Sequence, residues 1–225
     1  QKANRNTRGT LVLGFLAGVY ISMGGLLSVI VGYGFPEIAS ANPGIQRLLS
    51  GSMFPVGLIL VIFAGAELFT GNNATLMPGV LDRKFGWGRL LRNWSLVWIS
   101  NFAGALFFSY FPVYLTGVMN ADPWHSPLIG VAEAKAGLPW HVVFLKGIGE
   151  NGLVCLALWL GLSCRSAAGK MIGIWFSVVK FGANRLEHSH PHMFFCPPGK
   201  VEGAKLRMGR KALEHPKHAT LGNRV

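Results

Sequence analysis

The chain turns from apolar to polar at Ala66-Glu67-Leu68-Phe69-Thr70-Gly71-Asn72-Asn73, a segment that brings a carboxylate, a hydroxyl and two amides into a hydrophobic region. Residues 53–66 are almost entirely apolar, and apolar Leu76 and Met77 follow the polar patch. A helix that breaks inside lipid leaves backbone groups unpaired. Such a break is tolerated only where the backbone is buried in protein or lines a cavity. Transporters place ion sites at such breaks, because half-helix ends direct their dipoles at the ion. The alternative interpretation is a plain helix end capped by Gly71.

The composition is typical of a membrane protein, with 51% hydrophobic and 13% charged residues and a mean hydropathy of +0.40,. We therefore expect a lipid bilayer as the surroundings, and we do not take the formal net charge of +12 as a sign of nucleic-acid binding. No nucleophile and base stand in a recognisable arrangement, so the sequence does not predict an enzyme or a cofactor. The cysteines Cys155, Cys164 and Cys196 form no disulfide framework,.

Apolar segments long enough to cross or enter a membrane lie at residues 9–33, 52–69, 94–119, 138–162 and 171–183,. Residues 35–46 and 120–137 contain prolines and are expected to be loops,. Lys and Arg gather in residues 1–8, 81–92 and 165–170, which share one side if every segment spans. The positive-inside rule predicts that this side, with the N-terminus, faces the cytoplasm, or the matrix or stroma of an organelle. The expected location is a bacterial inner membrane, or an organelle or plasma membrane.

The positions of the breaks suggest two inverted repeats, an arrangement common in transporters. Residues 1–119 are interpreted as a first three-helix repeat, with the break in its second helix. Residues 120–225 are interpreted as an incomplete second repeat, with a break at Glu187-His188 in the fifth helix and a basic tail. The sixth span of such a repeat is not found. We expect residues 1–225 to form one transmembrane domain, an all-α inverted-repeat helix bundle with broken second and fifth helices.

Several motifs in the right order resemble the formate/nitrite transporter family. They lie at residues 13–22, 54–58, 65–72, 91–94, 101–104, 147–157, 173–175, 187–188 and 193–195. The resemblance covers residues 10–200 and implies an aquaporin-like protomer fold, a homopentamer and one pore in each protomer for small monovalent anions. Formate, nitrite, lactate and hydrosulfide all stay open as substrates, although the Gly71-Asn72-Asn73 run slightly favours nitrite.

The resemblance also assigns pore residues. Leu58, Leu68 and Phe69 match the cytoplasmic constriction, whereas Phe54, Val154 and Phe181 match the outer one. Thr70 and His188 match the polar groups of the two breaks, and Lys135 and Asn151 match the outer vestibule. Apolar rings block hydrated ions, a lysine attracts anions, and a histidine exchanges a proton near neutral pH. An anion that takes a proton in a low dielectric passes the apolar rings more cheaply than the ion does.

Other residues are expected to be structural, and most pore assignments have a plainer alternative. Glu67, Asn72 and Glu187 are expected to stabilise the helix breaks, with the two glutamates accepting backbone N–H bonds. Without the motifs, Lys135 would be a solvated loop charge and His188 a surface histidine. Ordinary packing would explain Phe54, Leu58 and Phe181.

A metal site and a non-conducting protein are the remaining alternatives. His188, His190 and His192 lie near Cys196, but Pro191 argues against the regular helix that would bring the histidines together, so we do not predict a metal site,. Glu150, Lys180 and Arg185 carry charges where the family is apolar or small, and an unpaired charge at the bilayer centre costs about 2.5–3.5 kcal/mol. Together with the missing sixth span, these charges leave open a truncated, non-conducting relative that only associates with the membrane or with full-length subunits.

Overall fold

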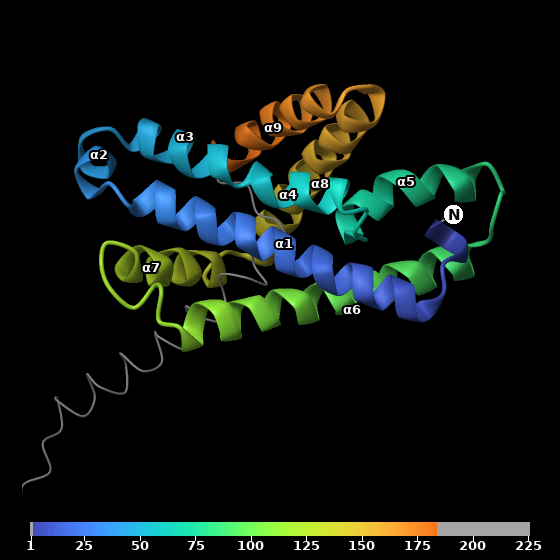
Figure 1. The fold of residues 1–225 in the computed structure, drawn as a ribbon, viewed down its shortest axis with the longest axis horizontal. Coiled ribbons are helices and arrows are strands. Elements are labelled where there is room, and N and C mark those ends of the chain that lie inside the picture. The colour runs from blue at the N-terminus through green and yellow to red at the C-terminus, as the bar shows by residue number, and fades with distance from the viewer. Residues whose placement is uncertain (1, 184–225) are drawn as a thin grey trace, which may run out of the picture.

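The computed structural model describes residues 2–183, and every regular element in that part of the chain is helical (Figure 1). The elements are η1 (Lys2–Asn4), α1 (Thr7–Tyr33), α2 (Pro36–Ala41), α3 (Pro43–Met53), α4 (Pro55–Phe63), α5 (Phe69–Leu81), α6 (Trp87–Phe108), the π-helical η2 (Ser109–Leu115), α7 (His125–Ala136), α8 (Trp140–Ser163) and α9 (Ala167–Ala183). The all-α class predicted from the sequence is therefore confirmed.

Four helical stretches among the described residues are long and apolar enough to cross a membrane: Thr7–Tyr33, Pro43–Phe63, Trp87–Leu115 and Trp140–Ser163. They contain 27, 21, 29 and 24 residues, and a bilayer core needs about 20 residues of α-helix. The helix α9 is apolar but shorter, and it packs against α8, α3 and α4. These lengths fit the fold of an integral membrane protein.

The long helix α1 lies at the centre of the bundle and packs against α6, α3 and α4 (Figure 1). Its closest neighbour is α6, because glycines on both helices let the two backbones touch. A Cβ atom at Gly18 would clash with the carbonyl oxygen of Asn101, and one at Gly104 would clash with that of Phe15. Small residues at such crossings allow the close van der Waals packing that holds helices together in lipid.

The break in the second span lies earlier in the chain than the sequence predicted. Helix α4 ends at Phe63, Gly65 turns the chain with a φ of +63°, and α5 begins at Phe69 after an extended Leu68. Gly71 is therefore inside α5, which rules out the alternative interpretation that it caps a helix end. The left-handed turn belongs to Gly65, since only glycine adopts that backbone conformation without strain.

Both segments predicted to be loops contain helices. The region 35–46 holds α2 and the start of α3, and Pro36 and Pro43 each occupy the first turn of a helix. A proline is tolerated there because the first N–H groups of a helix have no intrahelical partner. The region 120–137 holds α7, and the N–H of Ser126 donates to Asp122 Oδ1 at 3.0 Å near its start. Hydrogen bonds from Ser126 lower the pKa of the Asp122 carboxyl,.

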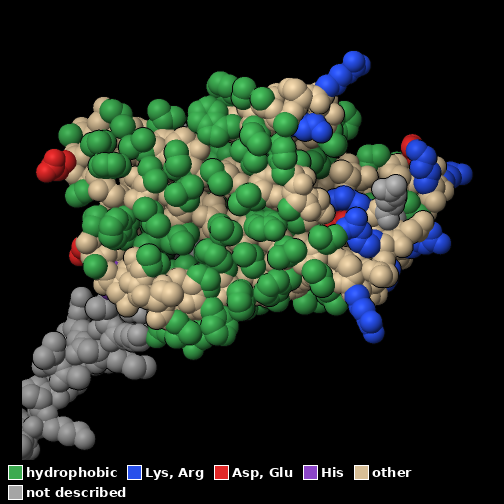
Figure 2. Space-filling model, viewed as in Figure 1, with side chains coloured by type: hydrophobic (Ala, Val, Ile, Leu, Met, Phe, Trp, Pro, Cys, Tyr) green, Lys and Arg blue, Asp and Glu red, His purple; other side chains and the backbone are tan. Residues whose placement is uncertain are grey.

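The basic residues gather at one end of the molecule, beside the N-terminal segment and the α5–α6 turn, while apolar side chains cover most of the rest of the visible face (Figure 2). Two hydrogen bonds join the N-terminal segment to α6. Arg89 Nη1 donates to Asn4 Oδ1 at 3.1 Å, and Arg92 Nη2 donates to Thr7 Oγ1 at 2.6 Å. The predicted placement of residues 1–8 and 81–92 at the same end is thus confirmed.

Candidate pore site

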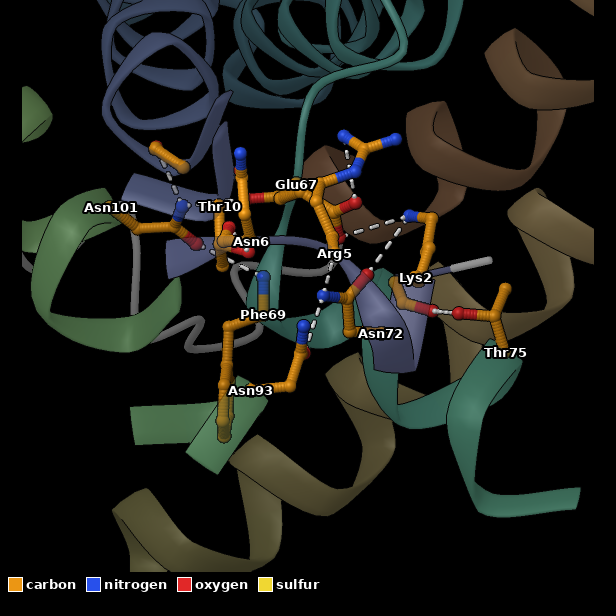
Figure 3. Close-up of polar contacts among 12 residues, drawn as sticks. Lys2, Arg5, Asn6, Thr10, Glu67, Phe69, Asn72, Thr75, Asn93 and Asn101 are labelled. Carbon is orange, nitrogen blue, oxygen red and sulfur yellow. Dashed lines mark hydrogen bonds and ion pairs between the residues drawn. The ribbon is translucent and has the colours of Figure 1, made fainter. Parts of the chain in front are cut away.

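A buried amide, Asn101 of α6, pairs with backbone groups at the helix break (Figure 3). Its Nδ2 donates to the carbonyl oxygens of Gly14 at 2.7 Å and Glu67 at 2.8 Å. Its Oδ1 accepts the N–H of Phe69 at 3.0 Å, which is the first N–H of α5. Asn101 therefore satisfies groups on both sides of the break and ties them to α1, as a break inside lipid requires.

Glu67 lies in the break with its side chain fully buried, and its partners are side chains (Figure 3). Asn72 Nδ2 donates to Glu67 Oε2 at 2.7 Å and also to Asn93 Oδ1 at 2.9 Å. Lys2 Nζ lies 3.3 Å from Glu67 Oε2, and Arg5 Nη1 lies 3.2 Å from Oε1. The expectation that Glu67 accepts backbone N–H bonds is wrong, because its carboxylate contacts only side chains among the described residues, while the N–H of Phe69 donates to Asn101.

A cavity of about 190 Å³ lies on the other side of the break, between α4, α5 and α8. Its walls are mostly apolar and include Leu58, Leu68, Val154 and Leu158, with Lys2 at one edge. Leu58, Leu68 and Val154 belong to one hydrophobic cluster, and Phe54 packs against it. Four residues with predicted pore roles are therefore brought together here. The resemblance assigns Leu58 and Val154 to different constrictions, whereas both line this cavity.

The Phe69 side chain packs outside this cavity. Its ring packs edge-on against the indole of Trp94, with ring centroids 6.1 Å apart. The contact lies on the α6 side of the break, and Phe69 is absent from the lining of the cavity that holds Leu58 and Leu68.

Two polar side chains with predicted pore roles keep an oxygen free of hydrogen bonds within the described residues. Thr70 is fully buried in the first turn of α5, and its Oγ1 has no partner there. The Thr70 carbonyl lies 3.9 Å from Cys155 Sγ on α8. Asn151 Nδ2 donates to the Gly147 carbonyl at 2.8 Å, while its Oδ1 has no partner in the same part of the chain. A buried oxygen without a partner is costly, which makes both groups candidates to meet a substrate.

For the remaining predicted residues, the structure gives only the helix to which they belong, or they lie outside the described residues. Lys135 belongs to α7, and Phe181 belongs to the last turn of α9. Glu187 and His188 lie outside the described residues, as do the other histidines weighed for a metal site. Within residues 2–183, no group of three or more metal-ligating side chains comes together.

Lys2 belongs to this site although no sequence motif points to it. Its ammonium group donates to Asn72 Oδ1 at 3.0 Å, in addition to its ion pair with Glu67. Lys2 lines the apolar cavity and also a second cavity of about 500 Å³ at the basic end of the molecule. The basic N-terminal segment is visible in the sequence, but the contact of Lys2 with Glu67, 65 positions away, can be seen only in the folded structure.

The structure combines an all-helical membrane bundle, a broken span, a buried network across the break and an apolar cavity beside it. These features define a membrane transport protein. The profile of the formate/nitrite transporter family matches residues 1–225. A probable formate transporter of Methanothermobacter thermautotrophicus is 41% identical over 203 residues, covering 84% of this chain and 74% of that protein. A nitrite transporter of Escherichia coli (strain K12) is 34% identical over 189 residues, covering 84% of this chain and 67% of that protein.

A solved structure of a pentameric formate channel with formate bound matches with a TM-score of 0.76 at 27% identity, covering 86% of this chain and 74% of that one. The chain belongs to the formate/nitrite transporter family, whose members transport small anions across membranes. The aquaporin-like helical fold expected from the resemblance is confirmed.

Proposed function

We propose that the chain carries small monovalent anions of the formate or nitrite type through a pore in each protomer, and that passage is linked to a proton. The observation that carries this proposal is the apolar cavity beside the break, with a cation at its edge and the unsatisfied hydroxyl of Thr70 at the adjacent helix start.

The cations at the basic end supply the attraction for an anion. Lys2 and Arg5 both pair with the single carboxylate of Glu67, so the three charges leave a net charge of +1. The N-terminal end of α5 adds a partial positive charge in the same region. An anion is drawn to this end of the cavity, and the attraction weakens as salt screens it.

The apolar section then favours the neutral acid over the ion. Leu58, Leu68 and Val154 offer no hydrogen bonds to replace the water around a charge. Burial of a charge in such surroundings raises the pKa of a weak acid, because the charged form loses its hydration. An anion that takes a proton crosses more cheaply. Thr70 is proposed to bind the substrate at this point, and His188, by resemblance, to exchange the proton.

The outer half of the pore is proposed from the resemblance. Phe54 and Phe181 are proposed to narrow it, and Asn151 to offer its amide to the substrate. Lys135 is proposed to attract anions in the outer vestibule, while Glu187 stabilises the second break as Glu67 does the first.

The assembly is proposed to be a homopentamer, as in the solved formate channel. Support comes from α8, which is long and apolar enough to span a membrane. Its apolar side chains Trp140, Phe144 and Ile148 are exposed in the single chain. Lipid or a neighbouring subunit must cover such a face. We propose that the basic end, with the N-terminus, faces the cytoplasm or the corresponding side of an organelle.

Flux measurements on reconstituted protein test the proposal. Liposomes containing the protein should take up formate or nitrite faster than empty liposomes, and an imposed proton gradient should speed uptake from the acidic side. Absence of uptake for both anions would instead favour the alternative of a non-conducting family member. Uptake without any response to the proton gradient would support the pore and contradict the proton linkage.

A further inference from the structure

The larger cavity at the basic end has no role in the proposal so far. It lies between the N-terminal segment, the second half of α5 and the α5–α6 turn, and its volume is about 500 Å³. Lys2 and Thr75 line both this cavity and the smaller apolar one. An anion that reaches Lys2 through the larger cavity passes the wall that contains Arg89.

The charged groups of this cavity are unequal in their ability to hold an anion. Lys84 Nζ lies 3.1 Å from Asp82 Oδ2, so these two charges largely cancel. Lys2 is engaged with Glu67 and Asn72. Arg89 pairs with no carboxylate among the described residues, and only its Nη1 is bonded, to Asn4 Oδ1 at 3.1 Å. Arg89 thus keeps its full charge and most of its donors.

From this geometry we infer that Arg89 forms a binding site for incoming anions, which they occupy before they reach Lys2. The inference rests on the proposed function. A guanidinium group presents paired N–H donors that match a carboxylate or nitrite in a bidentate way, which a lysine cannot do. The large, open volume lets the anion keep part of its hydration while it is held. The anion then moves to Lys2, at the edge of the apolar cavity, where it loses the rest.

The α5–α6 turn and the start of α6 contain matched arginines that do not line either cavity. Arg83 is exposed in the same turn, and Arg92 Nη2 is bonded to Thr7. Both are absent from the cavity walls that include Arg89. Replacing Arg83 with a neutral residue therefore removes an equal charge from the same end of the molecule without changing the cavity that holds Arg89.

The test measures formate flux in proteoliposomes, with formate supplied at the basic end and its concentration varied at low and at high ionic strength. Arg89→Gln should raise the KM about threefold at low ionic strength with the maximal flux unchanged, and high salt should abolish the difference. Arg83→Gln should behave as wild type. Arg89→Lys should restore only part of the low-salt KM, since it keeps the charge but not the paired donors.

Asn4→Ala separates charge from anchoring, because it removes the bond to Arg89 and leaves the charge in place. It should keep the wild-type KM. The inference is overturned if Arg89→Gln matches wild type at low salt while wild type carries formate, or if Asn4→Ala reproduces the Arg89→Gln effect. It is also overturned if the Arg89→Gln effect falls on the maximal flux at all salt concentrations. Absence of formate flux in wild type would instead remove the proposed function itself.

Discussion

The two sides of the helix break differ in how many buried polar contacts they hold. On the α6 side, Asn101, Asn72 and Glu67 are fully buried and joined by hydrogen bonds and ion pairs. On the α8 side, the cavity walls are apolar. Thr70 does not line this cavity but lies between its lining residues Leu68 and Gly71 in the chain, and its buried hydroxyl has no partner among the described residues. A hydrogen-bonded network stabilises a backbone, whereas a buried group without a partner can bind something else. We therefore propose that Glu67, Asn72 and Asn101 stabilise the break and that the apolar cavity forms the path.

The largest effect is expected for Asn101→Leu, which removes three hydrogen bonds across the break. Each is worth about 1 kcal/mol, and the orphaned backbone groups add to the loss, so the protein should lose about 3 kcal/mol of stability or fail to fold. Thermal unfolding of purified protein in detergent measures this. Ser109→Ala is the matched control, because Ser109 Oγ bonds the Ala105 carbonyl within the same helical stretch. Equal effects of the two substitutions would contradict the bridging role of Asn101.

A smaller loss of stability is expected for Glu67→Gln. The change leaves Lys2 and Arg5 without their shared carboxylate. Because both cations keep contact with solvent, at 34% and 33% exposure, the loss should be about 1–2 kcal/mol and below the cost for a fully buried pair. The melting temperature gives the readout, with Asp82→Asn as control for an exposed ion pair. If Asp82→Asn destabilises as much, burial of Glu67 is not what gives its ion pairs their strength.

How far the sequence predicts this fold depends on the kind of signal. Hydrophobicity predicts the spans well, since α1 and α8 closely match the apolar segments 9–33 and 138–162. It does not find α2 and α7, because prolines in their first turns resemble loop signals,. The position of the break depends on one backbone angle at Gly65, which leaves no trace in a hydrophobic pattern.

The candidate site was predictable only in part. Motifs lead to Leu58, Leu68 and Val154, which do share a cavity. They also lead to Phe69, which packs against Trp94 instead. Lys2 could not be found, because sequence alone does not show that the N-terminal segment folds back onto Glu67. Long-range contacts of this kind arise from tertiary packing and have no local pattern.

On the cavity side, Thr70→Val should lower anion flux while leaving stability unchanged. The valine keeps the shape of the side chain and removes an oxygen that bonds nothing within the described residues. Loss of one hydrogen bond of about 1 kcal/mol to the substrate corresponds to about a fivefold fall in flux. Flux and melting temperature are measured together. Unchanged flux would show that Thr70 does not contact the anion. A lower melting temperature would show that Thr70 stabilises the fold.

The smallest effect is expected at the outer vestibule. Lys135→Ala should reduce anion flux about twofold at low ionic strength, because one attracting charge is lost, and high salt should shrink the difference. The control is Lys170→Ala in α9, near the basic turn at residues 165–170. A reduction that does not depend on salt would indicate a folding effect in α7 rather than attraction of the anion.

Blocking the cavity chemically tests most directly whether anions pass beside the break. In a background without Cys155, Cys164 and Cys196, Leu158→Cys introduces a thiol into the cavity wall, and Leu156→Cys introduces one on the exposed face of the same helix. Benzyl methanethiosulfonate labels both, and mass spectrometry verifies complete reaction. Anion flux should stop in the labelled Leu158→Cys protein and continue in labelled Leu156→Cys. Full flux after complete labelling at position 158, or equal block at both positions, would contradict passage through this cavity.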